Sequence, residues 1–337
     1  MSFSPRQLLC AVTIAAVSLA ATACGDDGET ITLYSGRGER LIQPIIDRFE
    51  EESGINVEVN YGDNAELALL LQEEADAGRV EADLFLSQSP GSMGFIDDEL
   101  ATISSATLDL VDENARDKDG RWVGISGRQR VLVYDSTQVE PEELPDSIFG
   151  LLDERWDGQI GVAGGNGSFQ DFVTAMRFTD GEDATAQFLS DLDALDPVPY
   201  ANNNAIVQAV GRGEVQVGLV NHYYNFRALA EDPSVTSRNH VFAPGDPGGT
   251  LIVTAVGILE DSDQIELAEQ FLQFLLSEEG QTYFAEETFE YPLAPGIPTA
   301  GNVPPIEFDD VGANDLNELD GGLERTREII ADAGLES

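Results

Sequence analysis

The sequence predicts an α/β fold of two lobes joined by two crossing strands, and three features support this prediction. Strand and helix patterns alternate through the opening hundred residues, which is typical of βα units on a mostly parallel sheet. Two apolar, β-branched runs, at residues 124–135 and 251–257, are long enough to cross between lobes. The chain from about residue 29 onward is also long enough to fill two cores of ordinary size.

The first lobe is predicted from the period of its apolar residues. A β-rich run at 30–35 ends in Gly36, and apolar residues then recur at helical spacing over 41–49. Residues 55–60 alternate apolar and polar, as in a half-buried strand, and a leucine-rich helix follows from residue 64. A third short apolar strand covers 82–86.

The second lobe repeats this alternation. A helix is predicted at 148–152, and a strand at 159–162 runs into a glycine-rich turn at 164–168 that opens another helix. A strand at 215–220 leads to a helix at 225–230. We therefore expect lobe 1 to comprise residues 29–130 and 250–300, and lobe 2 residues 131–249 and 301–337. Two such lobes on a hinge close like a clamshell on a ligand, which binds at the carboxyl ends of the strands.

The N-terminus reads as an export signal. Arg6 precedes an apolar run at 8–20 that is too short to span a membrane. Residues 21–25, Ala-Thr-Ala-Cys-Gly, resemble a bacterial lipobox, which implies that Cys24 is lipidated. We expect residues 1–23 to be a signal peptide, residues 24–28 a lipid-anchored linker, and the protein a monomer held at the periplasmic side or cell surface by the lipid alone. The alternative is an ordinary cleaved signal with an incidental cysteine.

Composition excludes several classes of function. The other cysteine, Cys10, lies inside the signal, so the mature chain has no disulfide and no thiolate metal site. The net charge of −46, from 63 acidic and 17 basic residues, excludes nucleic acid as a partner. Such an acidic surface fits a high-salt environment, in which salt screens the self-repulsion.

Two adjacent tyrosines, Tyr223 and Tyr224, are the strongest chemical signal. Adjacent side chains on a regular strand face opposite ways, but at a strand-to-helix turn they can converge. Phenolate oxygen is a hard, basic donor that suits a trivalent ion, and coordination lowers the tyrosine pKa far below 10. A positive helix end would help to hold two negative oxygens. The alternative is a pair of aromatic rings that only pack at a domain edge.

The surrounding sequence resembles the ferric-ion-binding protein family, whose members are receptors of ABC transporters. Segments spread over the mature chain carry the resemblance: 31–35, 64–67, 126–134, 166–169, 200–224, 290–293 and 334–335. The resemblance implies the periplasmic-binding-protein (clamshell) fold, Fe³⁺ as the transported ligand, and delivery to an ABC-transporter permease.

The resemblance also implies a set of metal ligands. It assigns phenolates to Tyr223 and Tyr224 and a carboxylate to Glu66. Gly38 stands where many members have a histidine, and Phe169 where others have a further tyrosine, so the shell is short of protein ligands. Two residues are candidates to fill the gap: Glu39 and Tyr61. We expect both histidines outside the signal, His222 and His240, to be structural.

Members of this family commonly complete the shell with phosphate or carbonate. Asn166, Gly167 and Ser168 lie at a predicted helix N-terminus, where free amides attract anions. Asn203 and Asn221 match two asparagines that bind the anion in some members. Two arginines offer a bidentate grip on carbonate as the alternative: Arg128 and Arg130.

The sequence also bears on three other functions. A hydrolytic enzyme is disfavoured because the glycine-rich turn lacks the lysine of a nucleotide loop, and no nucleophile elbow or histidine triad is present. A receptor of the same fold for thiamine, a polyamine or a phosphonate remains the alternative, although an organic cation needs spaced aromatic walls and not adjacent phenols. The sequence does not distinguish a receptor that delivers its ligand to a permease from one that signals its occupancy to a sensor.

Overall fold

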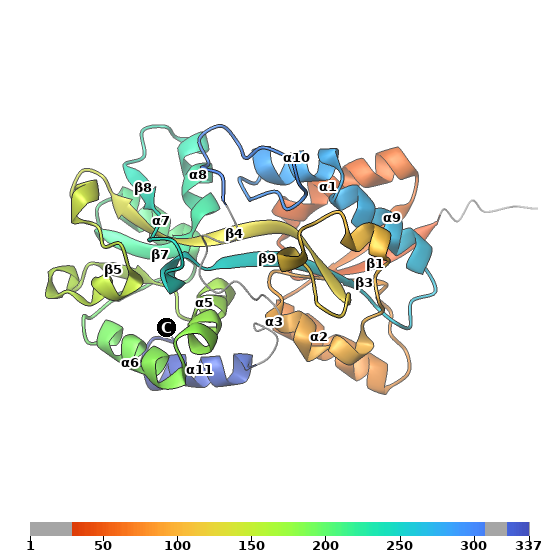
Figure 1. Cartoon of the computed structure of the whole chain (residues 1–337), viewed down its shortest axis with the longest axis horizontal. Helices are drawn as coiled ribbons and strands as arrows, with labels where there is room; N and C mark the ends of the chain where they lie inside the picture. The colour runs from red at the N-terminus through yellow and green to blue at the C-terminus, as the bar shows by residue number, and fades with distance from the viewer. Residues whose placement is uncertain (1–28, 307–321, 337) are drawn as a thin grey trace, which may run out of the picture.

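The computed structural model describes residues 29–306 and 322–336, and it has the predicted two-lobed α/β architecture. Figure 1 shows the lobes side by side, with strands β4 (Trp122–Asp135) and β9 (Leu251–Ile258) running between them. One nine-stranded sheet passes through both lobes in the order β2-β1-β3-β9-β4-β7-β5-β6, and β8 pairs with β4. The antiparallel pairing of β4 with β9 joins the two halves of this sheet.

The first lobe is built on three parallel strands. Strand β1 (Thr30–Ser35) lies between β2 (Asn56–Tyr61) and β3 (Leu84–Ser87), parallel to both, and β9 adds to β3 in the antiparallel sense. The helices of this lobe are α1 (Glu39–Ser53), α2 (Asn64–Asp76), α3 (Gly91–Phe95), α4 (Ser105–Leu108), α9 (Ile265–Leu275) and α10 (Glu278–Glu286).

Helix α1 shows why the predicted helix forms. Its apolar residues recur every three or four positions and all four are buried: Ile42, Ile45, Ile46 and Phe49. The helix ends at Gly54, whose φ of 76° is left-handed and favours glycine, and whose amide bonds back to the Glu50 carbonyl. The Phe49 ring then packs edge-on against Phe271 of α9, with centroids 5.0 Å apart, and so fixes α1 to the lobe.

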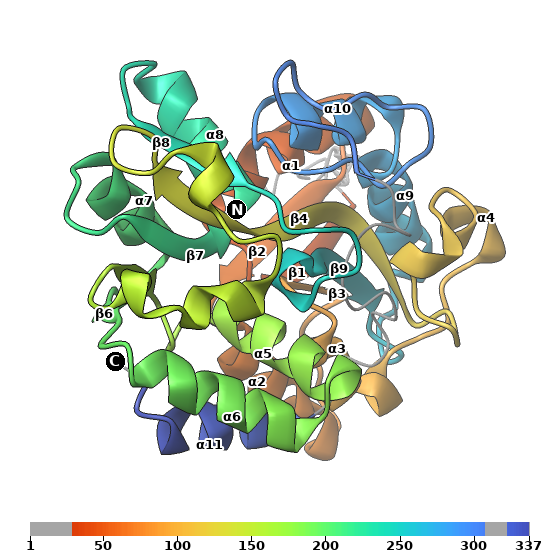
Figure 2. The ribbon, with the colours of Figure 1, turned by 60° about the vertical axis from the view of Figure 1, so that its left-hand side comes forward.

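The second lobe contains the remaining strands and helices. Its strands are β5 (Ile160–Val162), β6 (Val198–Pro199), β7 (Val217–Asn221) and β8 (Ser237–His240). Its helices are α5 (Gly167–Thr179), α6 (Glu182–Asp193), α7 (Asn203–Gly211), α8 (His222–Glu231) and α11 (Leu323–Asp332). Figure 2 shows α5, α6 and α11 packed together on one side of these strands.

Short 3₁₀ helices punctuate the connections. They cover Asp97–Glu99, Glu113–Ala115, Pro141–Glu143, Ile148–Leu152, Glu154–Trp156 and Pro247–Gly249. The segment predicted as a helix at 148–152 is therefore a 3₁₀ helix, in keeping with its five residues.

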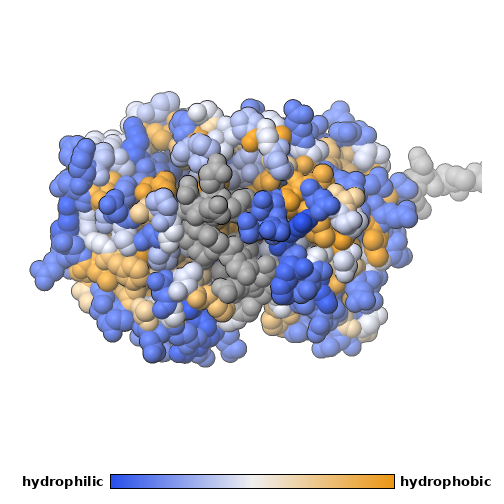
Figure 3. All heavy atoms as spheres, viewed as in Figure 1, coloured by the Kyte–Doolittle hydropathy of each residue, from blue (hydrophilic) through white to orange (hydrophobic). Residues whose placement is uncertain are grey.

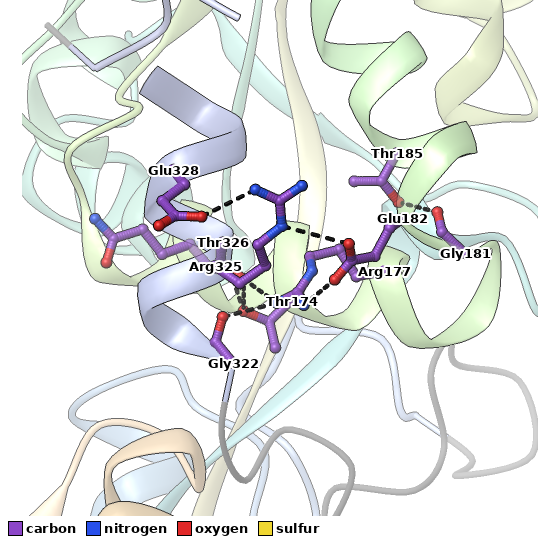
Figure 4. Close-up of polar contacts among 10 residues, drawn as sticks. Thr174, Arg177, Gly181, Glu182, Thr185, Gly322, Arg325, Thr326 and Glu328 are labelled. Atoms are coloured by element: carbon purple, nitrogen blue, oxygen red, sulfur yellow. Dashed lines mark hydrogen bonds and ion pairs between the residues drawn. The ribbon is translucent and has the colours of Figure 1, made fainter. Parts of the chain in front are cut away.

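The C-terminal helix α11 is fastened to α5 and α6 by polar contacts (Figure 4). Arg177 of α5 donates from Nη1 to the Gly322 carbonyl at 2.7 Å and to Thr326 Oγ1 at 2.9 Å. Thr326 Oγ1 also lies 2.7 Å from Thr174 Oγ1, and both threonines are buried. Glu182 of α6 pairs with Arg177 at 2.5 Å and with Arg325 at 3.3 Å. The chain end is thus held by side chains from both helices.

The distribution of the apolar clusters supports the proposed division into lobes. One cluster contains buried residues from segments 31–125 and 253–293, and Ala175 of α5 also belongs to it. Two further clusters collect residues from 131–242 and 329–335. We keep the boundaries 29–130 with 250–300 and 131–249 with 301–337 as a proposal that this separation favours.

Figure 3 shows hydrophilic side chains over the outer edges of both lobes, in keeping with the excess of acidic residues. In the described part of the chain, no helix combines the length and apolar character that a membrane span requires. The predicted signal peptide and Cys24 lie outside the described residues.

Candidate metal and anion site

Strand β7 leads directly into helix α8, and the tyrosine pair lies in the first turn of this helix. Asn221 ends the strand in an extended conformation, and the helix begins at His222, three residues earlier than predicted. The rings of Tyr223 and Tyr224 stack with centroids 4.1 Å apart and planes 28° apart. Tyr223 is 1% exposed, whereas Tyr224 is half-buried. The two rings therefore lie side by side on one turn of the helix.

A buried guanidinium lies beside this pair. Arg37, in the turn after β1, forms a fully buried ion pair with Glu290, and its Cζ is 5.6 Å from the centre of the Tyr223 ring. Burial acts to lower the pKa of Arg37, but the charge of Glu290 outweighs burial, so the pKa is raised. Arg37 is thus a permanent cation that links the first lobe to Tyr223 of the second.

Tyr223 is neutral in the free protein. Burial raises the pKa of its phenol well above 10, and Tyr224 raises it further, while Arg37 acts in the opposite direction. A ligand that binds this oxygen as phenolate must therefore displace a proton. Only a strongly charged group would do so at neutral pH.

The two histidines take structural positions. His222 is buried, accepts a hydrogen bond at Nδ1 from the Gln129 amide at 3.1 Å, and stacks on Tyr291 at 4.3 Å. Burial lowers the pKa of His222 to about 3, so the ring is neutral. His240 Nε2 lies 2.8 Å from the Pro145 carbonyl.

Most of the predicted anion-binding residues gather around Arg130. Its Nη1 donates to Asn221 Oδ1 at 3.0 Å and makes longer bonds to Ser168 Oγ and Asn203 Oδ1, at 3.3 and 3.4 Å. Asn203 Nδ2 donates in turn to Ser168 Oγ at 2.9 Å and to Asn166 Oδ1 at 3.1 Å. The turn at Asn166–Ser168 and the two asparagines are therefore one network organised by a buried guanidinium.

Unlike Arg37, the buried residues Arg128 and Arg130 form no ion pair within the described residues. Arg128 and Arg130 are 1% and 2% exposed, and burial lowers the pKa of Arg130 to about 9, which still leaves it charged at neutral pH. Arg128 has unpartnered Nε and Nη2 atoms, and Arg130 an unpartnered Nη2. Buried cations that form no ion pair and keep free donors are suited to bind an anion.

The nearest carboxylate moderates this positive charge. Burial raises the pKa of Asp171, on α5, to about 6, while Arg128 and Arg130 act to lower it. Asp171 lies one turn beyond Ser168 on the same helix, so both face the same cavity.

A polar cavity of about 210 Å³ lies between the lobes at this point. Residues from both lobes line it: Asp63, Asn64, Gln88 and Ser89 from the first, and Asn166, Gly167, Ser168 and Asp171 from the second, together with Arg128 of β4. Asn203 and Asn221 do not line the cavity but lie behind it with Arg130. Four of the six predicted anion-binding residues therefore face one space.

A second cavity, of about 300 Å³, brings Tyr224 to the first lobe. Tyr224, Asn204 and Arg227 line it from the second lobe, and Gly38 and Glu39 from the first. A side chain added at Gly38 would find open space, with nothing within 4 Å of its Cβ. Gly38, where the resemblance implies a histidine, thus borders the same space as Tyr224.

Glu66 is the one predicted ligand that the structure does not bring to the tyrosines. It lies exposed in the first turn of α2, lines neither cavity, and makes no hydrogen bond or ion pair within the described residues. In the described ranges, no group of three or more His, Cys, Asp or Glu side chains is placed to hold a metal.

Two residues of the site were missed by sequence reasoning. Arg37 sits between two glycines in the turn beside Gly38, and its burial was not evident because its partner, Glu290, is 253 residues away. Asp171 lies three residues after Ser168, a spacing that puts both on one face of a helix, and this spacing could have identified Asp171 as part of the site.

A two-lobed α/β fold with cavities between the lobes is the architecture of receptors that enclose a small solute. A family model described as bacterial extracellular solute-binding protein matches residues 81–314. The chain is also 31% identical over 345 residues to the major ferric iron-binding protein of Neisseria meningitidis serogroup A, covering 97% of this chain and 98% of that one. The chain belongs to this family of bacterial extracellular solute-binding proteins.

Solved structures agree with this assignment and confirm the predicted clamshell fold. Iron-bound HitA from Pseudomonas aeruginosa is 30% identical, with a TM-score of 0.85 over 91% of this chain and all of that one. A Trichodesmium protein (IdiA, FutA), solved in complex with iron and citrate, is 25% identical, with a TM-score of 0.78 over 91% of this chain and 99% of that one.

Proposed function

We propose that this protein captures ferric iron outside the cytoplasm and delivers it to an ABC-transporter permease. The observation that carries the proposal is the stacked pair of phenols, Tyr223 and Tyr224, at the helix start that borders the first lobe. The names of two relatives support it: the major ferric iron-binding protein of Neisseria meningitidis, and the Fe(3+)-binding periplasmic protein of Serratia marcescens.

The chemistry of the donors favours a hard trivalent ion. Two phenolates from Tyr223 and Tyr224 offset most of the ion's charge, and the N-terminus of α8 favours negative oxygens there. Glu66 is the proposed carboxylate, which reaches the ion from α2 when the lobes close. Hence the ion itself holds the clamshell shut.

Colour is the direct test. A ferric phenolate absorbs visible light, so the loaded protein should be coloured. Tyr223→Phe and Tyr224→Phe keep the rings and remove only the donor oxygens, and each should reduce iron affinity and shift or bleach the band. Tyr283→Phe is the matched control, since its hydroxyl donates to the Leu41 carbonyl in the first lobe. If the double tyrosine variant binds ferric iron as the wild type does, the proposal fails.

Glu66→Gln separates the two kinds of ligand. It should weaken iron binding while the phenolate band is largely retained, because the phenols still bind the ion. An unchanged affinity would remove Glu66 from the site and favour Glu39, which lines the same cavity as Tyr224.

Gly38→His tests the missing ligand by adding it. A side chain at this position enters open space beside Tyr224, so the substitution should be tolerated and should raise iron affinity. Gly38→Leu, of similar bulk and without a donor nitrogen, is the control. Equal affinities for the histidine and leucine variants would contradict this placement of the ion.

We further propose that an exogenous anion completes the shell from the second lobe. Arg128, Asn166 and Ser168 support this, because a buried cation and a helix N-terminus face the cavity between the lobes. Iron should bind more weakly when phosphate and carbonate are both removed, and each anion added back, with citrate as a third, should restore binding to a different extent. Affinity indifferent to all three would reject the anion.

Finally, we propose that the mature chain is a monomeric lipoprotein that begins at Cys24. Labelled fatty acid should be incorporated by wild type and not by Cys24→Ala, and light scattering should give the mass of one chain. Equal label in the two proteins would contradict the anchor.

If the purified protein is colourless and free of metal after iron loading, the same-fold receptor for an organic solute becomes the better description.

A further inference from the structure

A third cavity lies on the other side of the tyrosine-bearing helix. It measures about 570 Å³ and is bordered by α8, β8 and the segment that returns from Tyr291 to Pro304. Figure 1 shows α8 and β8 beside each other at the outer end of β4. None of the proposed metal or anion ligands lines this cavity. A volume of this size is typical of sites for small organic molecules.

Two amides on its wall have atoms without partners. Asn225 is 1% exposed, and its Oδ1 accepts a hydrogen bond from Ser237 Oγ at 2.7 Å, which leaves Nδ2 unpartnered. Asn239 donates from Nδ2 to the His222 carbonyl at 2.8 Å, which leaves Oδ1 unpartnered. Buried polar atoms are normally hydrogen-bonded. Asn225 Nδ2 therefore calls for an acceptor on a ligand, and Asn239 Oδ1 calls for a donor.

The charge of the cavity is opposite to that of the protein. Its lining includes Arg238 and no acidic residue, although the chain carries 63 acidic and 17 basic residues. Arg238 donates from Nη1 to the carbonyls of Val235 and Ser237, and it forms no ion pair with an acidic residue in the described ranges. Its guanidinium therefore retains donors for a carboxylate.

Apolar side chains form much of the remaining wall, together with His222, Asn302 and the rings of Tyr134 and Tyr291. Val131, Phe226, Leu229 and Val241 line the cavity, and Val241 is 44% exposed at its surface. These side chains match a hydrocarbon or aromatic body and offer nothing to an inorganic ion.

We propose that this cavity binds a small organic carboxylate with an apolar body and one hydrogen-bond donor. The carboxylate meets Arg238 and the Asn225 amide, the donor meets Asn239 Oδ1, and the body fills the apolar walls. This site is separate from the iron site and stands whether or not the protein binds iron.

Iron-free protein and matched probes test the proposal by calorimetry. The probes are 4-hydroxybenzoate, benzoate, which lacks the hydroxyl donor, and 4-hydroxybenzamide, which lacks the charge. We expect 4-hydroxybenzoate to bind with 1:1 stoichiometry. The benzamide should bind about tenfold more weakly or worse, since it loses a charge-assisted hydrogen bond, and benzoate should bind several-fold more weakly.

Variants locate the binding. Arg238→Gln and Asn225→Leu should each weaken 4-hydroxybenzoate about tenfold. Leu229→Trp should abolish binding by filling the cavity, and it covers the case in which Asn225→Leu fails to fold. Arg212→Gln removes an exposed arginine of another ion pair and should change nothing. The Tyr223→Phe, Tyr224→Phe double variant should bind the probe as the wild type does.

Three results would overturn the proposal. They are the absence of saturable binding at millimolar probe, equal affinity for the acid and the amide, and binding that survives Leu229→Trp but is lost in the double tyrosine variant. The last result would assign the probe to the space between the lobes.

Discussion

Glu290→Gln should cause a large loss of stability, because it removes one partner of a fully buried ion pair. Arg37 and Glu290 form a salt bridge whose side chains are 2% and 0% exposed. The second oxygen of Glu290 accepts a hydrogen bond from Thr288 Oγ1 at 3.2 Å. Glutamine keeps the shape of the side chain and removes its charge, so the guanidinium is left buried without a counter-ion.

The magnitude follows from burial. Removing one partner of a buried ion pair costs about 3–5 kcal/mol, because the other charge stays desolvated. Glutamine still accepts one hydrogen bond from Arg37, so we expect the lower end, about 3 kcal/mol. The matched control is Glu287→Gln, three residues earlier. Its pair with Arg48 is 37% and 50% exposed, and its loss should cost about 0–1 kcal/mol.

Urea unfolding of the iron-free protein measures both variants. Tryptophan fluorescence is a suitable probe because Trp122 lies in the core of the first lobe and Trp156 in that of the second. Glu290→Gln should lower the midpoint of the transition clearly, and Glu287→Gln should hardly move it. If the two free energies of unfolding agree to within about 1 kcal/mol, Arg37 finds solvent or another partner and the reasoning is refuted.

Three further predictions concern the site and the C-terminal helix. Because the pKa of Tyr223 is raised and its proton must leave, log affinity for iron should rise by about one unit per pH unit for each phenol deprotonated, and a flat profile would contradict this. Asp171, with a pKa of about 6, is anionic above that pH and repels an anion in the cavity. Anion binding should therefore strengthen as pH falls through about 6, and Asp171→Asn should bind more tightly at pH 7.5 without this step, whereas an unchanged profile would exclude Asp171. Arg177→Gln should speed amide exchange in α11 and not in α1, because it removes the bonds to Gly322 and Thr326, and equal protection would show that apolar packing alone holds the helix.

Local patterns were sufficient for most elements of the fold. The run predicted as a crossing strand at 124–135 is strand β4, Trp122–Asp135, because β-branched and small residues fill it without a helix period. Helix α8 was predicted to begin at Asn225 and begins at His222, since the aromatic residues before Asn225 gave no helix signal of their own. Propensity is weak at such a position, and packing against β4 and α7 decides it.

The candidate site, like the fold, was predictable only where the signal in the sequence is local. The turn at Asn166–Ser168 was predictable, because a polar turn before an apolar helix is a local signal for an N-terminus. The burial of Arg37 was not, because it depends on a carboxylate 253 residues away and on the stacking of Tyr223. Glu66 was assigned from resemblance alone, and its role stays a prediction.

Strand β4 has a consequence for how the specificity of this protein can change. The strand that joins the lobes also carries Arg128 to the cavity and Arg130 to the asparagine network, and its Gln129 amide holds His222 next to the tyrosines. Bending this strand therefore rotates the side chains that would contact the ligand. A substitution that alters the ligand preference here also alters the stiffness of the connection between lobes. We therefore expect selectivity and the rate of ligand release to change together when a residue of β4 is substituted.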